Sequence, residues 1–110
     1  MEIRTIVESL GLRILAGSES LDQEVEGCYV ADLLSCVMAG AEMGNLWITL
    51  QTHANIVAVA ALLGLPAIIV AEGAPVPEET LQKAEQQKVV MLSSAEPVYP
   101  TVARLVALGL

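Results

Sequence analysis

The chain has 110 residues, of which 55% are hydrophobic and 16% are charged, and its formal net charge is −8 at pH 7. That length is typical of one domain, and so large an apolar fraction excludes intrinsic disorder. The acidic balance argues against nucleic acid and anionic membranes as partners, because both attract basic proteins.

The N-terminal segment is expected to be helical. Apolar residues recur at helical spacing over residues 2–10 and Gly11 follows them, which predicts a helix. No long apolar stretch follows a basic start, so the segment is not a signal peptide. The longest apolar run, residues 56–71, is broken by Gly64 and Pro66 and is shorter than the roughly 20 residues of a membrane-spanning helix. We therefore expect a cytoplasmic protein.

Short apolar and β-branched runs predict the strands of one sheet. They occur over residues 12–16, 25–30, 46–50, 67–71 and 89–92. Helical signals lie between and after these runs. They predict four helices, which start at Asp32, at Thr52 or His53, at Pro77, and at Pro97 or Pro100.

The order of these elements predicts the fold. From residue 25 onward strands and helices alternate with short connections, which is typical of right-handed βαβ units. The strands that start near residues 46, 67 and 89 are almost wholly apolar, as expected of strands covered on both faces. We expect one α/β domain over residues 1–110. It has three layers, with a mostly parallel sheet of four to five strands and helices on both faces.

The helix expected over residues 56–63 is apolar on every face. A helix on one side of a small sheet usually keeps a polar face toward solvent. Two interpretations are open. Either the N-terminal elements cover this helix, or it lies in the interface of a homodimer, which we favour because a small domain has little material to bury a helix completely.

Polar residues follow the predicted strands at their carboxyl ends, the edge at which open parallel sheets bind ligands. The candidate ligand-binding residues are Asp32, Gln51, Thr52, His53, Asn55, Glu72, Gly73, Ser93 and Ser94. Structural roles are open for some of them. Asp32 and Thr52 fit helix caps, and Gly73 fits a turn that needs a positive φ.

His53 is the only histidine. It lies at an expected helix N-terminus, where an imidazole nitrogen can donate or accept a hydrogen bond. Catalysis would need His53 to act with Asp32 and with Ser93 or Ser94, but no nucleophile-elbow motif surrounds either serine. One histidine with scattered carboxylates is a poor metal site, so we expect no metal and no cofactor.

The sequence lacks the features of a phosphate-transferring enzyme. It has no GxxxxGK[ST] or GxGxxG motif, and no Lys or Arg between Arg13 and Lys83. Phosphoryl transfer needs cations to hold phosphate groups, so a kinase is not expected. Cys28 and Cys36 fit no usual metal or redox spacing, and we expect both to be small buried residues in a reducing compartment.

Residues 26–84 read EGCYVADLLSCVMAGAEMGNLWITLQTHANIVAVAALLGLPAIIVAEGAPVPEETLQKA. A Gly-x-x-Val-Ala-Asp-Leu start, two buried strands around an apolar helix, a glycine turn and a proline-started helix together resemble the DRTGG domain. The resemblance extends over about residues 10–108. The Asp-Arg pair of the family name falls at Thr52-His53 and the Thr-Gly-Gly at residues 71–73, so only Gly73 is retained. The chain is thus similar to a divergent, stand-alone member.

DRTGG domains occur beside the catalytic part of HPr kinase-like proteins, in some phosphotransacetylases, and between CBS modules of certain pyrophosphatases. The resemblance therefore implies a three-layer α/β fold and a non-catalytic regulatory, ligand-sensing or interaction module. The copies beside CBS modules belong to adenine-nucleotide-regulated enzymes, which implies a nucleotide as the ligand. The alternatives are an accessory interaction subunit of a redox or metabolic enzyme, and a small enzyme that uses His53.

Overall fold

The computed structural model describes residues 1–110 and contains five strands, five α-helices and one short 3-10 helix. In chain order these are α1 (Ile3–Leu10), β1 (Arg13–Ala16), η1 (Ser18–Ser20), β2 (Cys28–Val30), α2 (Leu34–Gly40), β3 (Leu46–Thr49), α3 (Asn55–Leu63), β4 (Ala67–Val70), α4 (Glu78–Gln87), β5 (Val90–Ser93) and α5 (Val98–Ala107). None of the helices combines the length and the apolar character needed to cross a membrane.

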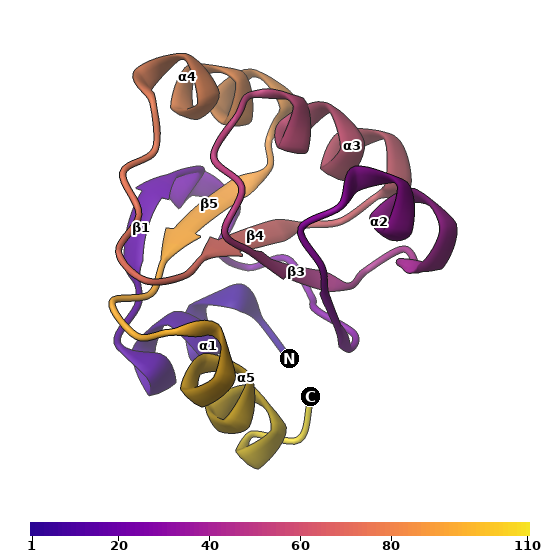
Figure 1. Ribbon diagram of the computed structural model, residues 1–110. Coiled ribbons are helices and arrows are strands. Elements are labelled where there is room, and N and C mark those ends of the chain that lie inside the picture. Colours follow the sequence, from indigo (N-terminus) through magenta and orange to yellow (C-terminus); the bar gives the residue numbers. More distant parts are fainter.

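The strands form one sheet in the order β1-β5-β4-β3-β2 (Figure 1). Strands β2 to β5 are parallel, and only β1 runs antiparallel to its neighbour β5. The predicted mostly parallel α/β sheet is therefore confirmed. Because β1 runs the opposite way, its first residue, Arg13, pairs with the last residue of β5, Ser93.

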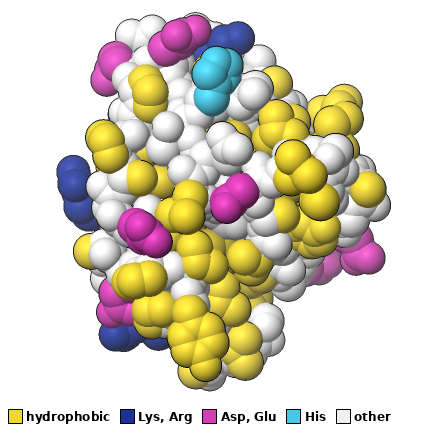
Figure 2. All heavy atoms as spheres, viewed as in Figure 1, with side chains coloured by type: hydrophobic (Ala, Val, Ile, Leu, Met, Phe, Trp, Pro, Cys, Tyr) yellow, Lys and Arg dark blue, Asp and Glu magenta, His cyan; other side chains and the backbone are white.

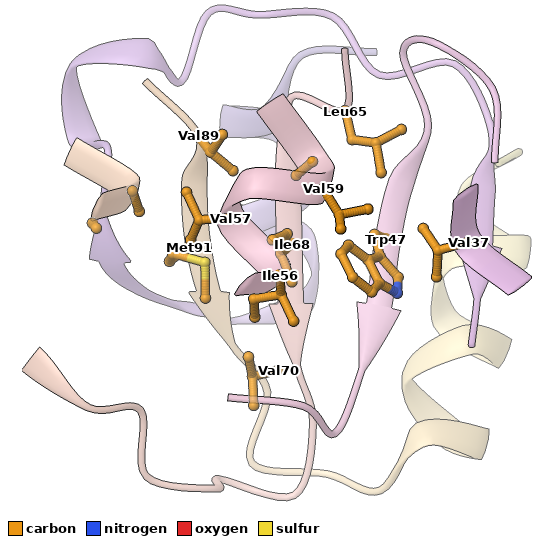
Figure 3. Packing of buried hydrophobic residues seen from close by; sticks show 13 residues of the cluster. Val37, Trp47, Ile56, Val57, Val59, Leu65, Ile68, Val70, Val89 and Met91 are labelled. Atoms are coloured by element: carbon orange, nitrogen blue, oxygen red, sulfur yellow. The ribbon is translucent and has the colours of Figure 1, made fainter. Parts of the chain in front are cut away.

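Three helices, α2, α3 and α4, cover one face of the sheet (Figure 1). Trp47 of β3, Ile68 of β4 and Met91 of β5 point into this layer and pack against Ile56 and Val57 of α3 (Figure 3). The indole of Trp47 is fully buried, and its Nε1 donates a hydrogen bond to the carbonyl oxygen of Ala31 at 2.8 Å. That bond satisfies the polar atom of the largest buried side chain.

The other face of the sheet is covered by α1 and α5 (Figure 1). Ile3 and Ile6 of α1 and Leu105 of α5 pack against the strand residues that alternate with those of the first face, such as Ile48 and Ile69. Successive side chains of a strand point to opposite faces, so two apolar layers require strands that are apolar at every position. This accounts for the continuous apolar runs in the sequence.

The all-apolar helix α3 lies between α2 and α4, and α1 packs on the opposite face of the sheet. The interpretation that N-terminal elements cover α3 is therefore wrong, because the antiparallel turn into β1 places α1 on the other side. The sheet and the neighbouring helices together bury Ile56, Val57, Val59 and Ala60. The outer stripe remains open, and Leu62 is 72% exposed.

Two predicted elements are shorter than expected. The strand expected over residues 25–30 begins only at Cys28, because the backbone N–H of Val25 bonds to the carbonyl of Met1 and that of Glu26 to Gly44. The helix expected to start at Asp32 begins only at Leu34, and it ends at Gly40 because Ala41 has an extended backbone.

Gly17 joins the end of β1 to the helical layer. Its φ is +83°, and a Cβ atom there would lie 2.9 Å from the Cα of Val90. Its backbone N–H donates to Glu85 Oε1 of α4 at 2.7 Å. Only glycine combines this close approach to a neighbouring strand with a left-handed backbone.

We expect Gly17→Ala to lower the free energy of unfolding by about 2–4 kcal/mol, from left-handed strain and overpacking together. Gly11→Ala is the matched control, because Gly11 also has a positive φ but has nothing within 4 Å of the added methyl group. Its cost should be about 1 kcal/mol. Urea unfolding at pH 7 measures both values, and equal costs would contradict the role assigned to close packing at Gly17.

Candidate functional site

The predicted site residues lie along the carboxyl edge of the parallel strands. Strands β2, β3, β4 and β5 all end at this edge, and the antiparallel β1 begins there. The residues divide into two groups, one after β2 and β3 and the other after β4 and β5. The two groups have different surroundings.

Asp32 connects the ends of β2 and β3. Its Oδ1 atom accepts hydrogen bonds from Thr49 Oγ1 at 2.9 Å and from the backbone N–H of Leu50 at 2.8 Å. The side-chain amide of Gln51 donates to the Asp32 carbonyl oxygen at 3.2 Å. The structure therefore brings Asp32 and Gln51 together.

Neither Asp32 nor Thr52 acts as a helix cap, so both capping predictions are wrong. Helix α2 begins after Leu33 and helix α3 begins after Ala54, each without a side-chain cap. The carboxylate of Asp32 is engaged by β3 instead. The carbonyl of Thr52 accepts a hydrogen bond of 2.7 Å from Thr80 Oγ1, which attaches the β3–α3 loop to α4.

His53 lies exposed just before α3 (Figure 2). Its Nδ1 atom accepts a hydrogen bond of 3.0 Å from the backbone N–H of Asn55, the first residue of the helix. An imidazole that accepts at Nδ1 carries its single proton on Nε2 when it is neutral. His53 and Asn55 are thus adjacent, and one ring nitrogen is occupied by the chain itself.

The loops after β4 and β5 are joined to each other. The backbone N–H of Gly73 donates to Ser94 O at 2.8 Å, and that of Glu72 donates to Glu96 O at 2.9 Å. The predicted positive φ of Gly73 is confirmed at +60°, and Glu72 also has a left-handed backbone. These two hydrogen bonds close the crevice between the loops that leave β4 and β5 toward opposite faces of the sheet.

The two serines after β5 have different environments. Ser94 is buried, and its hydroxyl lies 2.9 Å from Thr101 Oγ1 and accepts from the backbone N–H of Glu96 at 3.2 Å. It is therefore a structural residue of the β5–α5 connection. No hydrogen bond within the chain involves the hydroxyl of Ser93, although Ser93 is only 7% exposed.

A cavity of about 390 Å³ lies beside Ser93, between β1, α4 and the loop that connects β4 to α4. The residues that line it are Arg13, Leu15, Gly73, Ala74, Pro75, Val76, Leu81 and Ser93. Of the nine predicted site residues, only Gly73 and Ser93 contribute. The others are distributed along the edge and share no cavity with them.

Sequence reasoning missed Arg13. The sequence has no cation between Arg13 and Lys83, yet the antiparallel pairing of β1 places Arg13 opposite Ser93 at the carboxyl edge. Arg13 is exposed and forms no salt bridge, whereas Arg104 is paired with both carboxylate oxygens of Glu96. This placement follows only when it is known that β1 pairs with β5, which the sequence pattern does not indicate.

The side chains at this edge form neither a catalytic set nor a group of metal ligands. No hydrogen bond joins His53, Asp32 and either serine, and no cluster of three metal-ligating side chains occurs in the chain.

The prediction that both cysteines are buried is wrong for Cys36, which is exposed on α2. Cys28 is partly buried against the α1–α5 layer, and this desolvation raises the pKa of its thiol to about 11.

We expect Asp32→Ala to lower the free energy of unfolding by about 1–3 kcal/mol, because Thr49 Oγ1 and the N–H of Leu50 lose their acceptor. Asp32→Asn keeps an oxygen at this position and should cost less. Urea unfolding of both variants measures the difference. If Asp32 acted only on a ligand, neither substitution would change the stability of the ligand-free protein.

The fold resembles a solved regulatory region. That solved structure contains the CBS and DRTGG domains of the regulatory region of Clostridium perfringens pyrophosphatase, complexed with the activator diadenosine tetraphosphate. The TM-score is 0.73 at 15% sequence identity, over 96% of this chain and 46% of the other, so the chain spans about half the length of the solved one. No protein-family model and no curated protein sequence matches the chain. The predicted likeness to the DRTGG region is confirmed at the level of the fold.

Proposed function

We propose that the chain is a non-catalytic regulatory domain that responds to a small ligand, with adenine nucleotides as the first class to test. The observation that carries this proposal is the cavity at the carboxyl edge, which combines the unpaired Arg13 with Gly73 and Ser93. Nucleotides come first because the solved neighbour is a regulatory region complexed with a nucleotide activator, whereas the cavity itself supports only a small ligand. At 15% identity no individual residue role is transferred from it.

The hydrogen bonds of the edge favour a regulatory role over catalysis. A general base must reach the proton that it removes, and a nucleophile must lie beside its base. Here His53 Nδ1 is bonded to the backbone of Asn55, Asp32 to β3, and Ser94 to Thr101. These polar groups stabilise the loops of the ligand-free protein.

Thermal unfolding with AMP, ADP, ATP and diadenosine tetraphosphate tests the proposal. A ligand at about 100 times its Kd adds roughly 2.7 kcal/mol, which raises Tm by about 10 °C in a domain of this size. We expect one nucleotide to raise Tm and to remain chemically unchanged when analysed by chromatography after incubation. Turnover of that nucleotide would contradict the non-catalytic role, and no shift with any of the four at saturating concentration would contradict nucleotides as the ligand class.

A second candidate function is protein interaction, and the observation that favours it is an exposed apolar surface over α2 and α3, with Glu42 beside Met43 as its neighbouring charge. Neither helix contains a charged residue. Met38, Met43 and Leu62 are exposed there, and Met43 lies against Gly64 at the end of α3. We call these three residues the α2–α3 surface; Figure 2 shows hydrophobic side chains gathered on this side of the molecule.

We infer that a second copy of the chain covers the α2–α3 surface. Two copies with a net charge of −8 each repel one another, so they associate best where few charges are brought together, and the helices α2 and α3 carry none. A basic partner would instead bind the acidic surfaces. Side chains as exposed as Leu62 and Met43, at 72% and 80%, add apolar area that such a contact removes from water.

Sedimentation velocity tests this interface. We expect the wild-type chain to be a dimer and Leu62→Glu to be a monomer, since two new carboxylates would meet at the contact. Val106→Glu is the matched control, because Val106 is similarly exposed, at 63%, but lies on α5 on the opposite face. A monomeric wild-type chain, or equal dissociation of the two variants, would show that the α2–α3 surface is not a homodimer contact.

A further inference from the structure

Three cavities occur in the chain, and their linings differ in kind. One of about 270 Å³ lies at the opposite, amino end of β4 and β5, beside Leu65, Pro66 and Val89. One of about 210 Å³ has no apolar lining, and Glu19 and Glu85 both border it. Only the cavity beside Ser93 combines an unpaired cation, a free hydroxyl and an apolar wall.

We propose that this cavity binds a small organic anion, whose phosphate or carboxylate group pairs with Arg13 and Ser93 and whose compact apolar body packs against Leu15, Val76 and Leu81. This rests on the proposed regulatory response to a small ligand, and it takes that ligand to be a compact organic anion rather than a whole nucleotide. The cavity recognises charge and size.

Arg13 supplies the charge. The β1–β5 pairing fixes its backbone opposite Ser93, and no carboxylate of this acidic chain forms a salt bridge with it. A guanidinium group presents a planar set of donors that binds carboxylate or phosphate in a bidentate manner. The cation is therefore positioned and available.

Ser93 supplies a second polar contact. Every fully buried side-chain polar atom in the chain has a hydrogen-bond partner, and the Ser93 hydroxyl has none within the chain, so it opens onto the cavity. A serine hydroxyl can donate to an anionic oxygen. The neighbouring Ser94 is already satisfied by Thr101, which makes Ser93 the available serine at this edge.

The apolar wall and the volume limit the rest of the ligand. At about 390 Å³ the cavity is near the lower end of small-molecule sites, which run from roughly 300 to 1,000 Å³. A dinucleoside polyphosphate is too large to be enclosed. The lining has no aromatic ring and no side-chain amide, so a purine base would meet no group that recognises its edge.

The probes are monobutyl phosphate and butyrate, which share one apolar body and differ in the anionic group. Inorganic phosphate lacks the apolar body, and butanol lacks the anionic group. In ¹⁵N NMR titrations of the full chain, we expect butyl phosphate or butyrate to shift the backbone resonances of Leu15, Gly73 and Val76. Inorganic phosphate should bind more weakly, and butanol should cause no shift. The tighter of the two organic anions identifies the natural head group.

Arg13→Gln should weaken binding of the better probe by about ten- to a hundredfold, the range expected for losing charge-assisted hydrogen bonds. Arg4→Gln removes the same charge from α1, on the other face, and should leave binding unchanged. The NMR spectrum of each variant also reports whether it is folded.

Shifts that map outside the cavity, or an equal loss in the two arginine variants, would overturn the proposal, as would unchanged binding by Arg13→Gln. The outcome is separable from that of the regulatory proposal. A nucleotide that raises Tm, together with no shift of these resonances by either organic anion, supports regulation and refutes this site. An organic anion bound at Arg13, with no Tm response to nucleotides, supports the site and refutes nucleotide sensing.

Discussion

The burial of β3, β4 and β5 on both faces is the constraint on which the rest of the structure depends. Every residue of these three strands is buried, so the sheet needs two helical layers from one short chain. The connections between parallel strands supply the α2–α3–α4 layer on one face. The second layer must come from the ends of the chain, and α1 and α5 supply it. The antiparallel β1 follows, because the chain must return from α1 to the sheet edge.

This arrangement also decides where a ligand can enter. After β4 the chain turns to one face and after β5 to the other, which is the position where open α/β sheets usually form a crevice. Here backbone hydrogen bonds from Glu72 and Gly73 to the β5–α5 loop close that crevice. The cavity of about 390 Å³ lies instead on the other side of β5, beside β1. A residue that precedes the βαβ units, Arg13, therefore supplies the charge at the site.

Much of the fold could be predicted from local patterns. The continuous apolar runs predicted β3, β4 and β5, and Gly64 and Pro77 marked the end of α3 and the start of α4, because these signals depend on neighbours within one turn or strand. The pairing of Arg13 with Ser93 joins residues 80 positions apart, and no short-range pattern encodes it. For the same reason Asp32 was predicted as a cap, whereas Thr49 and Leu50 engage its carboxylate.

The irregular pairing of β1 with β5 has a thermodynamic consequence. The register shifts between Ile14 and Ala16, and β1 is the strand at the edge of the sheet, so its separation from β5 costs less free energy than opening the central strands. A molecule that touches both β1 and the β4–α4 loop binds only while the edge strand is docked. When a ligand occupies the cavity, local opening of the first 16 residues becomes less frequent. By linkage, the factor by which the ligand suppresses this opening equals the factor by which docking of β1 strengthens ligand binding. A single domain can in this way convert ligand concentration into the order of its own N-terminal segment.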